Sequence, residues 1–514
     1  MIIPNSAVRL LDDAVIKYKE KTAVSDETDS YSFIKLQSLG HSIATALLAV
    51  GDDSYMPEPV MVYLPKSGKC IASFMGAMYS GNPYVPIAYD MPAGRIQKIV
   101  DLLEGRGHII TDADGMAVID TMSIPETMHV HIYDEIITQT PDCDAVYKAL
   151  DKVIDTDPIY IMFTSGSTGE PKGVTVPHRG AVDYAIWVHN TFGIDENSKL
   201  GNQAPFYFDN SIFDIYSMLL TGAEMNIIPE TLFMFPSKLP EFIRENELTV
   251  IFWVPTVMIN VANSGVLEEI KMPTLKTVAF CGEVMPNTQL NIWRKNHPDA
   301  VYANLYGPTE ITCNCTYYIL DREFTEEEKL PMGVAFPNER VFLLDDENKE
   351  VTASGISGEV CVAGTALALG YYNNPEMTAK AFTINPLNPH YPEMIYHTGD
   401  LAYYGEDGEM YFAGRKDFQI KHMGHRIELG EIEVNVNMMP EIRLSGCIYD
   451  NEKGKIVLFY VGDIEAGDLT KALKDKLPRY MIPNYVKKLD EMPLTPNGKI
   501  NRVYLKELYK EARG

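Results

Sequence analysis

The sequence predicts an α/β protein with a large N-terminal domain and a small α+β C-terminal domain. Three observations lead to this prediction. The chain has 514 residues, which is too long for a single hydrophobic core. Short runs that are apolar on both faces alternate with helical patterns, as in parallel sheets covered by helices. The charge balance also changes sharply near the C-terminus.

The candidate strands appear in order along the chain. They are VMVYLP (60–65), PIYIMFT (158–164), LTVIFWVPT (248–256) and LKTVAFCGE (275–283). After about residue 338, acidic turns such as DDENKE and GEDGE separate shorter strands. We therefore expect two sheets rich in parallel strands, followed by smaller β-rich units.

The charge pattern indicates a separate C-terminal module. Residues 418–514 contain 16 lysines and arginines against 14 aspartates and glutamates, a net charge of +2. The whole chain carries −27, so the remaining 417 residues carry −29. We place the predicted boundary at 1–416 and 417–514.

Composition excludes several classes of protein. A net charge of −27 disfavours nucleic acid and anionic membranes as partners. No apolar run reaches the roughly 18–20 residues of a membrane helix, and the N-terminus lacks a signal-peptide layout. Seven cysteines without CxxC spacing indicate thiols in a reducing compartment, so we expect a cytoplasmic protein.

A stretch rich in glycine and hydroxyl side chains, FTSGSTGEPKGVTVPH (163–178), has the composition of a phosphate-binding loop. It is not a P-loop, because Gly169 is followed by Glu-Pro-Lys-Gly instead of Lys and Ser or Thr. It also lacks the GxGxxG dinucleotide fingerprint. By itself the stretch is equally consistent with an ordinary surface turn.

The order of five motifs decides between these readings. TSGSTGEPKG, YGPTE, YHTGD, GRKDFQIK and PNGK follow one another, and matching segments extend from PYVPIAYDMPAGRI (83–96) to PNGKINR (496–502). In this the chain resembles the adenylate-forming, AMP-binding superfamily, and especially the amino-acid adenylation enzymes. The resemblance implies a core of two α/β subdomains and a β-barrel-like subdomain, with a mobile C-terminal lid.

The resemblance implies an ATP site and a magnesium ligand. Glu310 would bind Mg²⁺, a cation that prefers carboxylate and phosphate oxygens. Asp400 would accept the ribose hydroxyls, and Asn304 and Tyr306 would contact adenine. The implied ATP-binding residues are Thr164, Ser165, Gly166, Ser167, Thr168, Gly169, Lys172, Asn304, Leu305, Tyr306, Gly307, Pro308, Thr309, Asp400, Phe412, Ala413, Gly414, Arg415 and Lys499.

Lys499 in TPNGKINR is the implied catalytic residue. In the family, such a lysine bridges the substrate carboxylate and the α-phosphate, a task suited to a compact ammonium on a long stem. Asp417 occupies the position of the hinge between the two domains. Gly424, in KHMGHRIELGEIE (421–433), would leave room for a pantetheine arm, although this segment also fits a plain β-hairpin followed by a helix.

The substrate is predicted to be a small amino acid. Asp209 in QAPFYFDNSIFD would pair with its ammonium, and Cys281 in VAFCGEVMP would crowd its α-carbon. These segments resemble D-alanine–carrier-protein ligases of lipoteichoic-acid D-alanylation, which makes D-alanine the leading candidate. The implied substrate-binding residues are Asp209, Asn210, Phe213, Phe252, Cys281, Leu305, Cys313 and Asn314.

Other functions stay open at this point. Phe213, Phe252 and Leu305 are bulkier than that family's usual residues, and Asn314 is more polar, so glycine, serine and small aliphatic amino acids are alternatives. The expected partner is a carrier protein with a phosphopantetheine arm, served by a free-standing enzyme. The alternatives are a nonribosomal-peptide-type adenylation enzyme for another amino acid, an acyl-CoA ligase and a silent nucleotide-binding protein.

Overall fold

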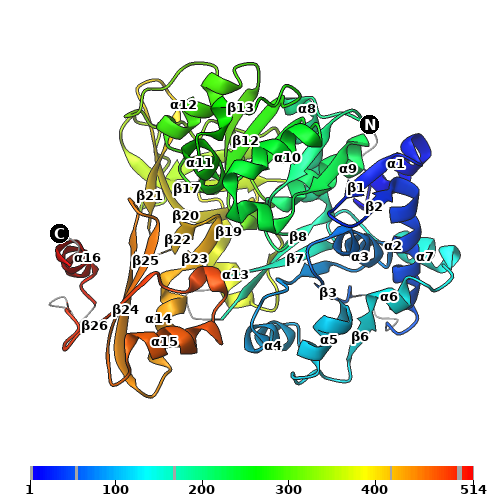
Figure 1. Ribbon diagram of the computed structural model, residues 1–514, viewed down its shortest axis with the longest axis horizontal. Coiled ribbons are helices and arrows are strands. Elements are labelled where there is room, and N and C mark those ends of the chain that lie inside the picture. Colours follow the sequence, from blue (N-terminus) through cyan, green and yellow to red (C-terminus); the bar gives the residue numbers. More distant parts are fainter. Residues whose placement is uncertain (1–3, 52–55, 166–169, 417–418, 495–499, 513–514) are drawn as a thin grey trace.

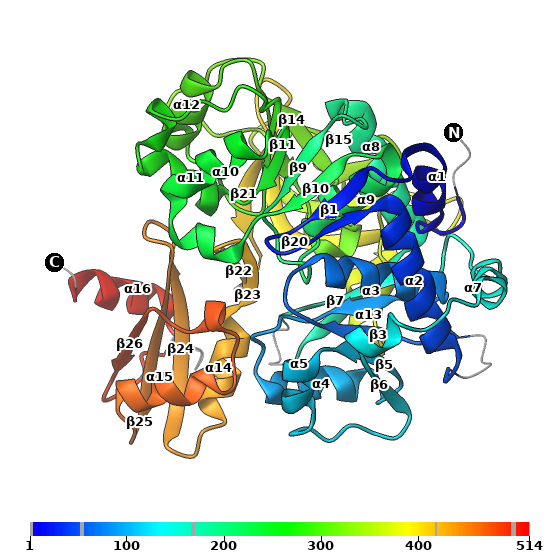
Figure 2. The same cartoon turned by 45° about the vertical axis from the view of Figure 1, so that its right-hand side comes forward.

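The computed structural model describes residues 4–51, 56–165, 170–416, 419–494 and 500–512. The chain up to residue 416 forms the larger part of the molecule, and the elements from β22 to α16 pack against one side of it (Figure 1). Figure 2 shows the three-stranded β24–β26 sheet outside the larger body, with β22 and β23 lying between them.

A sheet of seven strands organises the first half of the chain. Its order within the described residues is β18-β8-β7-β4-β3-β5-β6. The strands are β3 (Val60–Tyr63), β4 (Tyr84–Pro86), β5 (Gly107–Thr111), β6 (Met128–Ile132), β7 (Pro158–Thr164), β8 (Lys172–Pro177) and β18 (Gly370–Tyr371). Neighbours from β7 to β6 are parallel, and β7 pairs antiparallel with β8.

Both faces of this sheet are buried, which explains its continuously apolar strands. Val60 and Val62 of β3 pack into the core with helices α2 (Phe33–Leu48) and α3 (Gly68–Tyr79). Met61 and Tyr63 face the opposite cluster, with α4 (Ala93–Leu102) and α5 (Ala113–Ile119). Successive residues of β3 thus serve two different cores.

A second sheet of nine described strands has the order β15-β14-β13-β12-β11-β9-β10-β1-β2. The strands are β1 (Thr22–Ser25), β2 (Ser30–Ser32), β9 (Lys199–Asn202), β10 (Glu224–Ile227), β11 (Val250–Trp253), β12 (Thr277–Cys281), β13 (Val301–Tyr306), β14 (Thr316–Ile319) and β15 (Val334–Ala335). From β1 to β13 the neighbours are parallel. The carboxyl ends of β11, β12 and β13 therefore share one edge.

Helices cover both faces of this sheet as well. Trp253 and Phe280 pack with α10 (Leu239–Glu245), α11 (Pro255–Asn263) and α12 (Asn287–Asn296). Phe252 and Ala279 face the main core.

Further helices are α1 (Arg9–Tyr18), α6 (Tyr133–Ile136), α7 (Cys143–Leu150), α8 (His178–Phe192), α9 (Ser211–Thr221) and α13 (Pro375–Ala381). Short 3₁₀ turns are η1 (Glu230–Met234), η2 (Pro236–Lys238), η3 (Val266–Glu268), η4 (Thr309–Ile311) and η5 (Arg479–Met481).

An antiparallel sheet follows, with order β16-β17-β20-β19 and β21 also paired to β20. The strands are β16 (Glu339–Leu344), β17 (Ser357–Gly364), β19 (Phe382–Ile384), β20 (Met394–Tyr404) and β21 (Met410–Arg415). The β17–β20 register shifts between the pairs Cys361–His397 and Glu359–Leu401. This irregularity places residues 398–400 in a bulge.

The chain beyond residue 418 builds its own cores. The hairpin β22 (Gln419–His422) and β23 (His425–Glu428) leads into α14 (Leu429–Asn437). The remaining elements are β24 (Ile442–Asp450), β25 (Lys455–Gly462), α15 (Ala466–Lys474), β26 (Tyr485–Lys488) and α16 (Arg502–Glu511). The described members of the two clusters in this part all come from after residue 418.

The four predicted strands all form. β7 covers Pro158–Thr164 as expected, and β3, β11 and β12 lie inside the three other predicted segments. The mixed α/β architecture is confirmed. Over the ranges that are described, the chain contains no helix long and apolar enough to cross a membrane.

Candidate active site

A cavity lies where the first two sheets, the antiparallel sheet and the β22–β23 hairpin meet. Its walls come from strand ends, from the turns that follow them and from the part of the chain beyond residue 418. The lining residues are Met162, Phe163, Thr164, Ser165, Tyr207, Phe208, Asp209, Asn210, Cys281, Gly282, Gly307, Pro308, Thr309, Asp400, Arg415, Gln419, Lys421, Gly424, Arg426 and Tyr480.

Asp209 lies in this cavity, just before the start of α9. The N-cap of α9 is Asn210, and the first turn begins at Ser211, so Asp209 is not the helix cap. Burial raises the pKa of Asp209 to about 6, against the opposing hydrogen bond from the Thr309 hydroxyl. A carboxylate in such surroundings gains from a bound cation.

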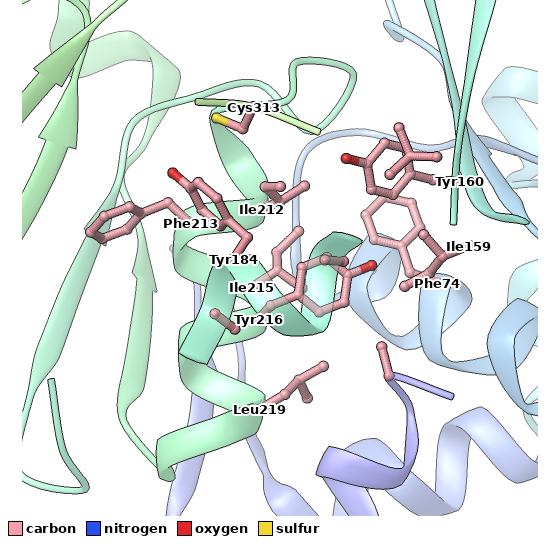
Figure 3. Close-up of a cluster of buried hydrophobic side chains, with 14 of the residues drawn as sticks. Phe74, Ile159, Tyr160, Tyr184, Ile212, Phe213, Ile215, Tyr216, Leu219 and Cys313 are labelled. Carbon is pink, nitrogen blue, oxygen red and sulfur yellow. The ribbon is translucent and has the colours of Figure 1, made fainter. Parts of the chain in front are cut away.

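Several of the predicted substrate-binding side chains are buried away from the cavity. Phe213 and Phe252 are fully buried, with ring centroids 4.7 Å apart, and Leu305 is 2% exposed. Tyr184 lies edge-on to Phe213 at 6.5 Å. Figure 3 shows Phe213, Tyr184 and Cys313 close together near one end of α9. None of these side chains lines the cavity in this structure.

Hydrogen bonds fix the groups around Cys281. Asn314 Nδ2 donates to Cys281 Sγ at 2.9 Å, while Asn314 Oδ1 accepts from the Tyr184 hydroxyl at 2.7 Å and from Cys313 Sγ at 3.2 Å. The side-chain amide of Asn314 is thus engaged on both sides within the protein. Burial raises the pKa of Cys281 to about 11, so the group is a neutral thiol at neutral pH.

The glycine-rich loop leaves the carboxyl end of β7. Ser165 Oγ donates to the carbonyl of Arg426 at 2.8 Å and accepts from the N–H of Glu428 at 3.1 Å. Thr164 Oγ1 is buried and has no hydrogen-bond partner among the described residues. The predicted residues Gly166, Ser167, Thr168 and Gly169 lie outside the described residues.

Glu310 is fully buried and surrounded by cationic and hydroxyl groups. Its carboxylate pairs with Arg426, accepts from the Tyr371 hydroxyl at 2.8 Å and lies 3.6 Å from Lys172 Nζ. Burial alone would favour the neutral acid, but Arg426 and Lys172 outweigh it and hold the pKa of Glu310 far below its usual range. Glu310 is therefore a permanent carboxylate facing positive charge.

Asp400 is presented by the bulge in β20. The Thr398 hydroxyl accepts from the Asp400 N–H at 3.0 Å and donates to the Val360 carbonyl at 2.8 Å. One carboxylate oxygen of Asp400 accepts from the Tyr306 hydroxyl at 2.6 Å, and the other pairs with Arg415. Bulges commonly re-aim side chains beside active sites, and here the bulge turns Asp400 into the cavity.

The remaining predicted nucleotide residues lie around this centre. Gly307, Pro308 and Thr309 line the cavity after β13, whereas Tyr306 is behind them and Lys421 Nζ lies 5.7 Å above its ring. Asn304 in β13 donates its amide to the Pro331 carbonyl at 2.8 Å. Phe412, Ala413 and Gly414 belong to β21 beside Arg415 and do not line the cavity.

The β22–β23 hairpin brings Gly424 to the cavity. Its two-residue turn has Met423 at φ 53° and Gly424 at φ 81°, the left-handed pair of a type I′ turn. The Gly424 N–H donates to Glu283 at 3.0 Å, and a Cβ at Gly424 would meet Val254 Cγ1 at 2.8 Å. The segment is thus both a hairpin followed by a helix and a wall of the cavity.

Several lining residues were not predicted individually. Lys421 and Arg426 belong to the segment assigned to the thiol tunnel. Two basic side chains so near Gly424 could have indicated from the sequence that they also line the cavity. Tyr480, in LPRYMIP, stacks on His425 with centroids 3.7 Å apart and reaches the cavity from η5. Only tertiary contact reveals it.

The predicted hinge Asp417 and the predicted catalytic Lys499 lie outside the described residues. Leu494 and Ile500 are the described residues that flank the segment containing Lys499. Leu494 and Ile500 form an isolated bridge, and Ile500 packs with the cluster of β25 and α16. Neither Leu494 nor Ile500 lines the cavity.

Comparison with known proteins defines the class of protein. The model of the AMP-binding enzyme family matches residues 11–372, which include Thr164, Asp209 and Glu310. The chain therefore belongs to the AMP-binding enzyme family. It is 33% identical over 488 residues to the D-alanine--D-alanyl carrier protein ligase of Bacillus velezensis, covering 92% of this chain and 93% of that protein.

Two further relatives extend the comparison. Tyrocidine synthase 1 of Brevibacillus parabrevis is 30% identical over 97% of this chain, but the chain spans only 44% of that protein's length. The structure of the Vibrio cholerae adenylation domain AlmE in complex with glycyl-adenosine-5'-phosphate matches with a TM-score of 0.82 at 20% identity, covering 99% of each chain. This structural likeness supports the fold.

Proposed function

We propose that the enzyme activates a small amino acid with ATP, forming an aminoacyl adenylate and pyrophosphate, and then transfers the aminoacyl group to the phosphopantetheine thiol of a carrier protein. D-Alanine is the leading substrate. The family membership supports the nucleotide chemistry, and the relatedness to D-alanyl carrier protein ligases supports the amino acid and the acceptor.

One observation carries the substrate assignment: the buried carboxylate of Asp209 lines the cavity, and so does Cys281. An α-ammonium would pair with the buried carboxylate of Asp209 and offset the cost of burying its charge. Phe213 and Phe252 are bulky and fully buried, which favours a small amino-acid side chain. Asn314 does not line the cavity, and its amide is hydrogen-bonded to Cys281 and Tyr184.

The nucleotide would lie along the strand ends and the bulge. Asp400 would hold the ribose hydroxyls, Thr309 would meet the α-phosphate, and the Thr164–Lys172 loop would hold the departing pyrophosphate. Glu310, ionised and buried, suits Mg²⁺, which would neutralise phosphate charge during adenylation. Its carboxylate is paired with Arg426 in this arrangement, so metal binding requires Arg426 to withdraw.

We further propose that the C-terminal part, 417–514, is a separate domain that rotates about Asp417 between the two half-reactions. The hairpin with Gly424 and Arg426 faces the cavity in this structure, while Leu494 and Ile500 do not line it. This arrangement suits thiol transfer. Rotation would bring Lys499 to the carboxylate and α-phosphate for adenylation.

The decisive experiment is ATP–pyrophosphate exchange over D- and L-alanine, glycine, D- and L-serine and propionate, followed by loading of a phosphopantetheinylated carrier protein. We expect exchange with D-alanine first and none with propionate. Exchange with propionate comparable to that with alanine, together with CoA as acceptor, would identify an acyl-CoA ligase instead.

The variant Lys499→Ala tests whether Lys499 acts in the adenylation step and not in ATP binding. A contact made only in the adenylation transition state contributes about 3–4 kcal/mol, so exchange should fall roughly 150- to 900-fold while ATP affinity changes little. Lys506→Ala, in α16, is the matched control and should retain exchange. Exchange within a few-fold of wild type in Lys499→Ala rejects the assigned role.

A second candidate is a nonribosomal-peptide-type adenylation enzyme for another small amino acid. The relation to tyrocidine synthase 1 over 97% of this chain favours it. The same substrate panel decides between the two, because this candidate predicts preference for an L-amino acid or glycine.

A further inference from the structure

A cluster of metal-ligand side chains lies on the antiparallel sheet, away from the cavity. Glu359 and Cys361 come from β17 and His397 from β20, and their ligand atoms all lie within 4.8 Å of one another. Within the described parts of the chain, this is the one group of three such side chains. We propose that it binds Zn²⁺ through Glu359 Oε2, Cys361 Sγ and His397 Nδ1.

The distances match those of a tetrahedral zinc site. Zinc lies about 2.3 Å from sulfur, about 2.0–2.1 Å from imidazole nitrogen and about 2.0–2.2 Å from carboxylate oxygen. Tetrahedral angles then separate sulfur from nitrogen by about 3.5 Å, and nitrogen from oxygen by about 3.4 Å. The structure has 3.6 Å between Cys361 Sγ and His397 Nδ1, and 3.2 Å between His397 Nδ1 and Glu359 Oε2. Two of the three ligand pairs are therefore already spaced for the ion, and Cys361 Sγ lies within 4.8 Å of the carboxylate of Glu359.

The sheet positions these ligands. Cys361 and His397 are directly paired across β17 and β20, and the adjoining bulge brings Glu359 toward the same imidazole. Glu359 Oε1 accepts from the Gly399 N–H at 3.0 Å, which leaves Oε2 for the metal. The fixed backbone therefore sets two of the three ligand positions.

Outer contacts also suit metal binding. His397 Nε2 lies 3.0 Å from the Thr383 hydroxyl, which can accept a hydrogen bond from Nε2–H and so leave Nδ1 as the ligand atom. Cys361 is fully buried, whereas the side chains of His397 and Glu359 are 21% and 13% exposed. An ion can reach the cluster from that exposed side, and a water can take the fourth position.

Lys416 competes with the proposed ion. Its Nζ lies 3.4 Å from Glu359 Oε2 and 3.1 Å from Asp346 Oδ1. When Zn²⁺ binds, the Cys361 thiol releases its proton to solvent and Lys416 keeps Asp346 as its partner. The ion would tie β17 to β20 three residues before Asp400.

Cobalt(II) titration of the chelator-treated full-length enzyme tests the proposal. We expect one equivalent to bind with a thiolate-to-cobalt charge-transfer band, and Zn²⁺ to displace it. Cys361→Ser should abolish the band, and Thr383→Val should weaken binding about tenfold. Cys143→Ser is the matched control, because Cys143 also has an imidazole 3.7 Å away, that of His41. It should retain the band.

Two measurements make the test independent of folding defects. Lys416→Met should bind the ion more tightly than wild type, since it removes the competing ammonium. Zn²⁺ should also raise the melting temperature of wild type but not of Cys361→Ser, because ligands that bind only the folded state stabilise it. The proposal fails if wild type gives no charge-transfer band, if the band survives in Cys361→Ser, or if Lys416→Met binds no more tightly.

Discussion

At the scale of single residues, the raised pKa of Asp209 should affect both the binding of the amino acid and the stability of the folded protein. Its pKa is raised to about 6 by burial, and in the proposed function only the ionised form would pair with the substrate ammonium. The kcat/KM for the amino acid should therefore rise with pH through about 6 and level off above it. A profile without this limb would remove Asp209 from ammonium binding.

Replacement of Asp209 gives the complementary prediction. Loss of one partner of a buried charge pair costs about 2–5 kcal/mol, so Asp209→Asn should lower kcat/KM by roughly 30-fold to several thousand-fold. A carboxyl whose folded pKa exceeds its unfolded value destabilises the folded state as pH rises from about 4 to about 6. The variant should thus melt at a higher temperature at pH 8 despite its lost activity. Loss of both activity and stability would indicate a structural role.

Cys281 is expected to select chirality by occupying space. With Asp209 holding the ammonium, the thiol admits hydrogen on its side of the α-carbon and rejects methyl. Overpacking costs about 1–3 kcal/mol, equivalent to about 5- to 150-fold discrimination. Cys281→Gly should narrow the D/L ratio in pyrophosphate exchange. Cys281→Ser retains an acceptor for Asn314 and should keep most of the preference. An unchanged ratio in the glycine variant contradicts this role.

At the scale of elements, a change in the β22–β23 hairpin should slow transfer of the aminoacyl group to the carrier without slowing adenylation. Gly424→Ala adds a Cβ 2.8 Å from Val254 Cγ1 and strains a left-handed turn. It should spare pyrophosphate exchange and slow carrier loading. Val254→Ala in the same chain should recover part of the loading, because it relieves the contact. Met423→Ala, at the neighbouring exposed turn position, adds neither a Cβ nor a contact and should load the carrier normally. Equal loss in both half-reactions would refute the tunnel assignment.

Elements also show how far sequence reasoning reaches. β7 and β12 were predictable because apolar runs on both faces identify strands covered by helices. Arg426 and Glu310 are 116 residues apart and meet only when the hairpin folds over the cavity. The bulge before Asp400 was equally hidden, since a shift in register leaves no mark on local composition. The family resemblance predicted Asp400 as a site residue, whereas its hydrogen-bond partners could be identified only from the structure.

At the scale of the whole molecule, a buried ion pair joins the two parts. Arg95 in α4 pairs with Glu431 in α14, with 6% and 0% of their side chains exposed. Removing one member of a buried pair costs about 3–5 kcal/mol and disfavours this arrangement. Arg95→Met should therefore slow carrier loading and leave pyrophosphate exchange near wild type. Arg9→Met, whose pair with Asp151 is exposed, is the control. Unchanged loading would mean that the pair does not stabilise the transfer arrangement.

Long-range electrostatic attraction should direct the carrier protein to the part of the molecule that follows residue 417. Phosphopantetheine carriers are typically acidic, and the body up to residue 417 carries −29 against +2 for the remainder. Exposed Lys474, Lys476 and Arg479 lie at the end of α15 and in the turn that leads to Tyr480 in the cavity wall. Reversing these three to glutamate should lower the rate constant for carrier association by about 10-fold or more and flatten its dependence on salt, with exchange unchanged. Reversal of exposed Lys152 and Lys349 on the main body should have much less effect. An equal loss from the main-body reversal would mean that the carrier is attracted by the molecule's overall charge and not by this surface.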